Sequence, residues 1–278
     1  DLDLIDPHPR SVPALETGEV GFVIAGIKTL DDVRIGDTIT VALRAAVEAL
    51  PGFREVKPMV FAGLYPVDAE EYAALKAALE KLRLNDASFR YEPETSAALG
   101  FGFRCGFLGF LHAEIIQERL EREYSLNLIS TTPTVRYQVV LNTGESIEID
   151  SPADLPDLTR IERVEEPLIL ATIHVPAEYL GAVLALCQER RGAQRDMTQH
   201  GTRVQVRYEL PLAEVVADFH DRIKSATRGY GSFDYELLDE READVVKVDI
   251  LVNAEKVDAL SQLVHREFAR PRAVRYCE

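Results

Sequence analysis

Apolar and polar positions follow two different periods along the chain. Residues 59–65 form an apolar, strand-like run, and the next segment, 69–81, places Tyr72, Leu75 and Leu79 on one helical face. The elements expected after it are a strand around 87–91, a strand over 97–105, a helix over 110–124 and a strand over 128–140. The order predicted for this part is therefore strand, helix, two strands, helix, strand.

The same order recurs further along. The second series is a strand over 168–175, a helix over 177–190, a hairpin of 194–199 and 202–210, a helix over 213–226 and a strand over 233–239. An additional strand over 243–252 and a helix over 255–266 are expected after it. We therefore predict an α+β fold with two ferredoxin-like split-βαβ (βαββαβ) domains.

The flanking segments have other patterns. Residues 19–25 and 37–41 are expected to form short strands, which cannot bury a face alone and are therefore predicted to be the last strands of a β-barrel. Pro51-Gly52 marks the boundary that follows. Residues 141–166 are acidic and contain prolines, so they are expected to be a connector with at most a short hairpin.

Charge narrows the range of functions. The 278 residues carry a formal net charge of −16, which argues against general binding to nucleic acid, because that needs a net positive surface. Basic residues are nevertheless concentrated over 186–208, so any contact with RNA is expected to be local. Apolar runs fall far short of the ~20 residues of a membrane span. The three widely spaced cysteines are typical of buried thiols in a reducing, cytoplasmic compartment.

The segment from Leu99 to Gly109 alternates glycine with aromatic residues, but it contains no phosphate-binding motif. Glycines on one face of a strand allow another backbone or an RNA to approach closely. Plain turn chemistry is the alternative. The glycines predicted to form this close-approach face are Gly100, Gly102, Gly106 and Gly109.

No catalytic, cofactor-binding or metal-binding constellation stands out. The better functional candidates lie at the ends of the helices in the second split-βαβ unit. At one of these ends, glycines flank an aromatic residue next to cations. Such residues stack on RNA bases and bind phosphates, although cations at helix ends are also explained by the helix macrodipole. The candidates for contact with RNA are Arg190, Arg191, His200, Lys224, Arg228 and Tyr230.

Several segments together resemble the LepA family of translational GTPases, known as elongation factor 4, which is related to elongation factor G. They include Asn85-Asp-Ala-Ser88, Tyr91-Glu-Pro-Glu94, the glycine stretch, Asp150-Ser-Pro152 and Val257-Asp-Ala-Leu260. The resemblance covers about residues 12–270. It implies the end of barrel domain II over 1–50, domain III over 51–140, the connector over 141–166, domain V over 167–270 and the start of a C-terminal domain over 271–278.

The resemblance also implies a function. Members of the family bind the ribosome, with tRNA nearby, hydrolyse GTP with Mg²⁺ and are linked to back-translocation of tRNAs. Domain V contacts ribosomal RNA, which assigns that role to the six candidates, and domain III couples to the GTPase domain. We expect a monomeric fragment without the GTPase domain, hence without a cofactor of its own, in the cytoplasm or at the cytoplasmic face of the cell membrane.

Two alternatives remain open on the residues alone. Paired βαββαβ units also form regulatory modules that bind a small ligand between them. In the second alternative, the chain is a structural frame that binds nothing without its missing domains. Fold analogy cannot separate these functions from a ribosomal factor, because one fold serves many functions.

Overall fold

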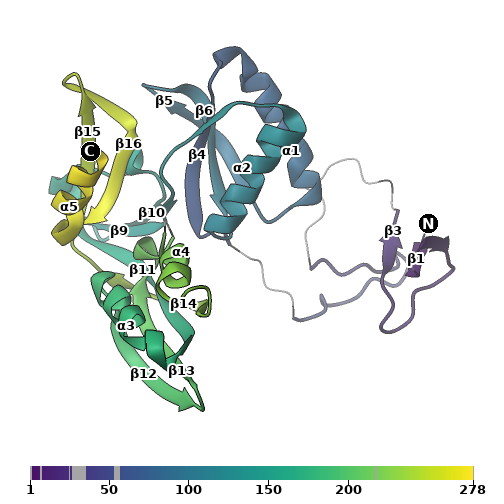
Figure 1. The fold of residues 1–278 in the computed structure, drawn as a ribbon. Helices are drawn as coiled ribbons and strands as arrows, with labels where there is room; N and C mark the ends of the chain where they lie inside the picture. The colour runs from purple at the N-terminus through teal and green to yellow at the C-terminus, as the bar shows by residue number, and fades with distance from the viewer. Residues whose placement is uncertain are drawn as a thin grey trace. The chain divides into compact units, whose positions relative to one another are not determined.

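The computed structural model describes residues 2–6, 8–24, 26, 36–52, 57–216 and 218–277. The chain forms two compact units, Asp1–Val56 and Lys57–Glu278, each with its own sheets (Figure 1). The larger unit holds all the candidate residues.

The N-terminal unit contains a small antiparallel sheet in the order β2-β1-β3. Its strands are β1 (Leu2–Asp6), β2 (His8–Ser11) and β3 (Gly21–Val23). The strand expected over 19–25 is thus found over 21–23, with Ala25 outside the described residues. The strand expected over 37–41 is absent: the Thr38 and Thr40 hydroxyls accept hydrogen bonds from local backbone amides, which compete with strand pairing.

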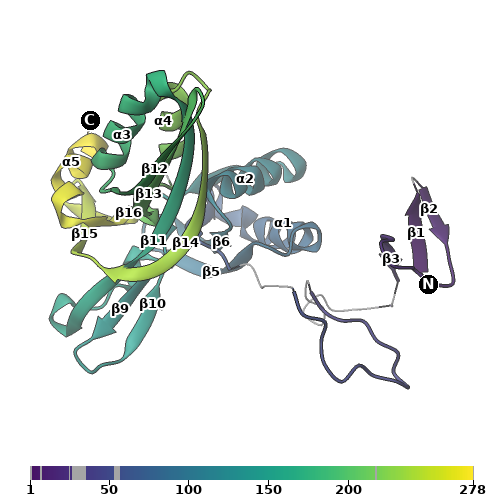
Figure 2. The same cartoon turned by 90° about the horizontal axis from the view of Figure 1, so that it is seen from below.

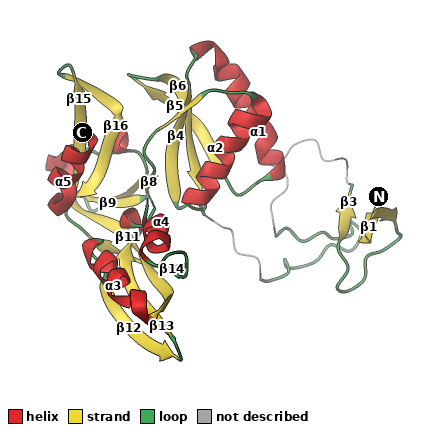
Figure 3. Ribbon diagram, viewed as in Figure 1, coloured by secondary structure: helices red, strands yellow, loops and turns green. Residues whose placement is uncertain are grey.

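The larger unit begins with a split-βαβ domain. Its elements are β4 (Val60–Pro66), α1 (Tyr72–Asn85), β5 (Arg90–Ser96), β6 (Gly100–Phe107), α2 (Phe110–Tyr124) and β7 (Leu128–Ser130). The antiparallel sheet has the order β5-β6-β4-β7, and both helices lie on one face of it (Figure 3). Leu75, Leu79 and Leu82 of α1 are buried against it with Ile116 and Leu120 of α2. This confirms the predicted ferredoxin-like arrangement.

Two glycines of β6, Gly102 and Gly106, lie under aromatic rings of the neighbouring strand β4. Phe61 is directly opposite Gly106, where a Cβ atom would lie 2.8 Å from Cε1 of Phe61. At Gly102 a Cβ atom would collide with the ring of Tyr65 and with the carbonyl oxygen of Leu64.

The sequence predicts a bare face at these glycines, but aromatic side chains cover it at Gly102 and Gly106. A Cβ atom at Gly100 would meet nothing within 4 Å, and one at Gly109 would lie 3.6 Å from the Tyr235 hydroxyl oxygen. The close approach at Gly102 and Gly106 is made within the sheet, by side chains of β4.

A second split-βαβ domain follows. Its elements are β11 (Ile161–Pro176), α3 (Leu180–Glu189), β12 (Ala193–His200), β13 (Arg203–Pro211), α4 (Phe219–Ala226) and β14 (Ser232–Glu242). The strands are ordered β12-β13-β11-β14 and are antiparallel, which matches the first domain. Figure 2 shows α3 and α4 on one side of this sheet. The second ferredoxin-like prediction is thereby confirmed as well.

Residues 128–166 depart from the expected single strand and connector. Pro133 interrupts the strand, which is divided into β7, β8 (Thr134–Val135) and β9 (Tyr137–Leu141). β9 then pairs with β10 (Ser146–Ile149), so the short hairpin allowed by the sequence is present. On its other edge, β9 pairs with the first residues of β11, which adds the hairpin of β9 and β10 to the sheet that contains β11. Much of this acidic segment is therefore part of a sheet.

The prediction of a helix over 255–266 is wrong. This segment is β16 (Glu255–His265), which pairs with β15 (Val245–Val252), and the helix α5 (Arg266–Cys277) comes only after it. Asn253 and Ala254 both have positive φ angles, 53° and 66°, which is the geometry of a two-residue hairpin turn. Alanine is unusual in such a turn, and the spacing of apolar residues in this segment is compatible with either element.

Asp258 connects the β15–β16 hairpin to the first split-βαβ domain. Its carboxylate accepts hydrogen bonds from Ser96 Oγ at 2.7 Å and from the backbone amide of Ala97 at 2.8 Å. Burial opposes ionisation of this carboxyl, but these hydrogen bonds, with further ones from the amides of Ala98 and Ala259, lower the pKa of Asp258. A charged Asp258 therefore stabilises this contact.

We expect Gly102→Ala to lower the free energy of unfolding by ~1–3 kcal/mol, because the new methyl group meets a backbone carbonyl that cannot move aside. Gly181→Ala is the matched control. Gly181 lies in α3 with open space around its Cα, so alanine there should raise stability by up to ~1 kcal/mol. Urea unfolding of both variants checks this, and equal effects would contradict the close approach at Gly102.

We expect the stabilising effect of Asp258 to be lost in acid. Its folded-state pKa is lowered, so its contribution is complete above the unfolded-state pKa of ~3.9 and disappears as the pH falls through the folded-state value. The difference in unfolding free energy between wild type and Asp258→Asn should therefore be larger at neutral pH than near pH ~3. Glu255→Gln, which removes one carboxylate at an exposed position of the same strand, is the matched control.

Candidate nucleic-acid interface

The register of β11 brings several of the candidates to one end of the second split-βαβ domain. Pro176, at the end of β11, is opposite Arg203, next to the turn that carries His200. His174 is opposite Ser232, immediately after the loop that carries Tyr230. The two loops are joined directly, because the Arg203 guanidinium donates a hydrogen bond to the Tyr230 carbonyl oxygen at 3.4 Å. We call Arg203, the turn at His200 and the loop 227–231 the loop end.

The loop 227–231 is held by hydrogen bonds along its length. Thr227 Oγ1 donates to the Ile223 carbonyl and accepts from the Gly231 amide at 2.8 Å. The Gly229 amide donates to the Lys224 carbonyl at 2.7 Å, and Lys224 Nζ donates to the Gly231 carbonyl at 2.9 Å. These contacts hold the left-handed conformation at Arg228 and Gly229. The loop is thus ordered by its own contacts.

Tyr230 is displayed by this loop and is 59% exposed. Its ring lies parallel to that of Tyr179, with an interplanar angle of 10° and ring centroids 6.4 Å apart. Tyr179 precedes α3, so the pair joins the start of one helix to the loop after the other. Arg228 is exposed beside it. The loop end therefore combines flat aromatic surface with cationic groups.

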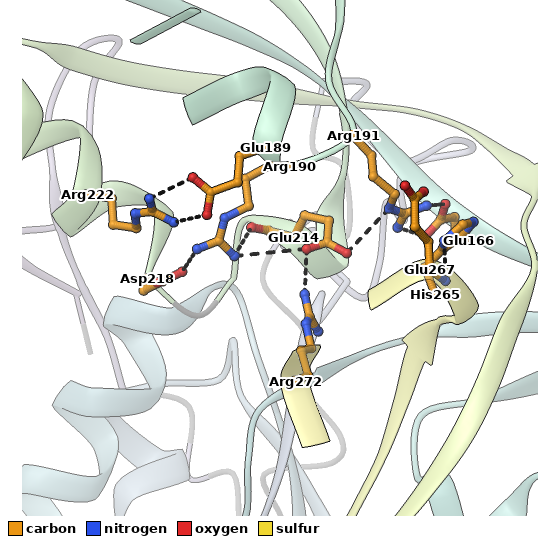
Figure 4. A network of polar contacts seen from close by, with 10 residues as sticks. All are labelled: Glu166, Glu189, Arg190, Arg191, Glu214, Asp218, Arg222, His265, Glu267 and Arg272. Carbon is orange, nitrogen blue, oxygen red and sulfur yellow. Dashed lines mark hydrogen bonds and ion pairs between the residues drawn. The ribbon is translucent and has the colours of Figure 1, made fainter. Parts of the chain in front are cut away.

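Arg190 and Arg191 lie elsewhere, at the opposite end of α3, whose ten residues span about 15 Å. Both side chains belong to an internal network of ion pairs (Figure 4). Arg191 donates to both carboxylate oxygens of Glu166, at 2.6 and 2.7 Å. Arg190 donates to Asp218 at 2.6 Å. A phosphate would have to compete with these carboxylates for either guanidinium.

Glu214 is the centre of this network, with only 3% of its side chain exposed. Its carboxylate pairs with Arg190 at 3.9 Å, with Arg191 at 3.4 Å and with Arg272 of α5. Burial opposes the charge of Arg191, but its hydrogen bonds to Glu166 and the nearby charges raise its pKa. The network thus neutralises arginines within the fold and attaches α5 to the domain.

The three cysteines all lie outside the loop end. Cys187 is fully buried, and burial raises its pKa to about 12, as it also raises that of Cys105. Cys277 is exposed.

Within the described ranges, no group of three His, Cys, Asp or Glu residues is placed to hold a metal ion. None of the described helices is long and apolar enough to cross a membrane.

The segment that contains the loop end matches a known protein family. Residues 163–251 match the family model described as the elongation factor G C-terminus. This segment is related to elongation factor G, a translational GTPase. The match covers β11 to β15 and includes all six residues proposed to contact RNA, whereas the glycines of β6 lie outside it.

A structural search gives a weaker similarity. A crystal structure of a protein from Thermus thermophilus is 20% identical, with a TM-score of 0.47. The alignment covers 72% of this chain and 43% of that protein, so this chain spans less than half the length of the protein it matches. The similarity is too low to assign a function.

Two residues at or beside the loop end, Tyr179 and Arg203, were missed in the sequence. Tyr179 immediately precedes α3 and has no predicted role in the sequence analysis. Arg203 contacts Tyr230 across 27 positions of sequence, and only strand register reveals that contact. The roles of Arg190, Arg191, His200, Lys224, Arg228 and Tyr230 in contact with RNA stay predictions.

We expect Glu214→Gln to lower the free energy of unfolding by ~3–5 kcal/mol, because it leaves buried arginines without their central carboxylate. The control is Glu189→Gln, which breaks the solvent-exposed pair of Glu189 with Arg222. Exposed pairs contribute about 1 kcal/mol or less. Denaturant unfolding separates the two, and a Glu214 variant as stable as the Glu189 variant would show that the network is not a stabilising centre.

Proposed function

We propose that this chain is the ribosome-binding, domain-coupling part of a translational GTPase of the LepA (elongation factor 4) type. The observation that carries the proposal is the match of residues 163–251 to the elongation factor G C-terminus, which contains the basic, aromatic loop end. The motifs outside that segment, above all Leu99–Gly109, supply the resemblance to LepA. On this proposal the parent protein acts in back-translocation of tRNAs.

Hydrolysis of GTP with Mg²⁺ is proposed for the complete protein and not for this part of it. The 278 residues contain no GxxxxGK[ST] sequence, whose backbone amides and lysine hold nucleotide phosphates. We therefore expect the isolated chain to bind no nucleotide. Its proposed partners are ribosomal RNA, ribosomal proteins and the GTPase domain, with tRNA nearby. We propose a monomer in the cytoplasm, with peripheral association at the cell membrane.

The loop end is proposed as the surface that meets ribosomal RNA. Arg203 and Arg228 are exposed, and His200 lies on the adjacent turn, so positive charge gathers at this end of a chain with a formal net charge of −16. Such a separation confines attraction to phosphates to one surface, since the remaining surface repels RNA. Arg190 and Arg191 are given a structural role here, because carboxylates already bind them.

We expect the chain to co-sediment with bacterial ribosomes in a salt-dependent manner. The variant Arg203→Glu with Arg228→Glu should bind at least ~10-fold more weakly at about 100 mM salt, because lost phosphate contacts lower both the affinity and its salt dependence. Lys76→Glu with Lys81→Glu makes the same change of charge on exposed positions of α1 and should bind as wild type does.

Equal loss of binding in both double variants would show that total charge matters and that the loop end does not. Undiminished binding by the Arg203 and Arg228 variant would move the contact to another surface. Stoichiometric binding of labelled GTP by the isolated chain would overturn the assignment of nucleotide chemistry to the rest of the protein.

A further inference from the structure

The rings of Tyr179 and Tyr230 stack beside the loop end, with centroids 6.4 Å apart and an interplanar angle of 10°. Tyr179 is half-buried, whereas Tyr230 is 59% exposed, so one ring supports the other and leaves it open to solvent. A large exposed aromatic ring loses contact with water only when a partner covers it. The arrangement thus offers a flat surface for a flat ligand.

The conformation that displays Tyr230 is built in advance. Arg228, with a φ of 52°, adopts the left-handed region that residues with a side chain rarely occupy, and such strain is found where surrounding contacts impose it. Here those contacts are made by the backbone of the loop and by the side chains of Thr227, Lys224 and Arg203. The Tyr230 amide donates to the Thr227 carbonyl at 3.0 Å, and its carbonyl accepts from Arg203. Because the ring is already placed, binding a ligand on it costs little conformational entropy.

The charges around the rings favour an anionic ligand. Arg203, Arg228 and Lys224 lie in the loop end or contact it, against the exposed carboxylate of Glu178 next to Tyr179. A flat, apolar surface beside guanidinium groups suits a nucleobase with its attached phosphates. A base inside a duplex presents only its edge, so the ligand must be an unpaired base of a loop, a bulge or a single strand.

We propose that Tyr179 and Tyr230 form a stacking platform for one unpaired RNA base, whose flanking phosphates bind Arg203 and Arg228. This inference rests on the proposed function and adds to it an unpaired base as the part of the RNA that is bound, and a residue, Tyr179, with no role in the sequence analysis. Tyr230 contacts the base, and Tyr179 is a positioning residue that supports the Tyr230 ring from behind.

The experiment uses the full chain and a short single-stranded RNA that contains one 2-aminopurine, whose fluorescence is quenched when it stacks. Tyr230→Leu should weaken binding about tenfold and abolish the quenching, since a stacked base contributes that much or more to affinity. Tyr230→Phe keeps the ring and should bind within about twofold of wild type. Tyr179→Leu should reduce the quenching, and Tyr179→Phe should restore it. Thermal melting of each variant verifies that it folds.

A matched RNA with an abasic site in place of the 2-aminopurine separates the base from its phosphates. Wild type should bind it about tenfold more weakly, and Tyr230→Leu should no longer distinguish the two RNAs. Equal affinity of Tyr230→Leu and Tyr230→Phe, or no RNA binding by wild type, overturns the platform.

Co-sedimentation with ribosomes tests the proposed function apart from the platform. If the leucine variants bind ribosomes as wild type does and the Arg203 and Arg228 variant does not, the ribosomal function stands and the platform fails. If the leucine variants lose ribosome binding but bind the RNA normally, the rings meet a ribosomal protein, which also overturns the platform. If wild type binds no ribosomes, the proposed function itself fails.

Discussion

Strand β11 is hydrogen-bonded along both of its edges, and the C-terminal part of the molecule depends on this pairing. Its first residues pair with β9 and the later ones with β13, while β14 occupies the opposite edge. Ile169, Ala171 and Ile173 alternate onto the face that α3 and α4 cover, which fixes both helices. Because Pro176 is opposite Arg203 and His174 is opposite Ser232, the same register places the two loops of the loop end side by side.

Arginines have two different environments in this domain. Arg190 and Arg191 are enclosed with Glu166, Asp218 and Glu214, so their charge is neutralised within the fold. Such pairs are costly to break, because an unpartnered buried charge loses both its hydration and its counter-ion. Arg203 and Arg228 stay exposed at the surface. Burial beside carboxylates, and not the number of arginines, distinguishes the neutralised arginines from the exposed ones.

In the first split-βαβ domain, aromatic side chains pack closely against glycines of the neighbouring strand. Gly102 and Gly106 make room for Tyr65 and Phe61 on the face of the sheet opposite the helices. Tyr65 then donates a hydrogen bond to Glu94, and burial together with that carboxylate raises the pKa of Tyr65. The close approach at Gly102 and Gly106 is therefore explained by packing inside this domain.

The sequence by itself determined both split-βαβ domains, because alternating strands and one-sided helices are local patterns that burial must satisfy. It also located the loop 227–231, since glycines on either side of an aromatic residue carry a local signal. It did not distinguish a strand from a helix over 255–265, where apolar spacing suits either and the turn at Asn253 and Ala254 is unusual. Only the tertiary structure decided that Arg190 and Arg191 face carboxylates and that Tyr179 lies behind Tyr230. Those contacts join residues 25 to 51 positions apart, and strand register, not local pattern, brings such residues together.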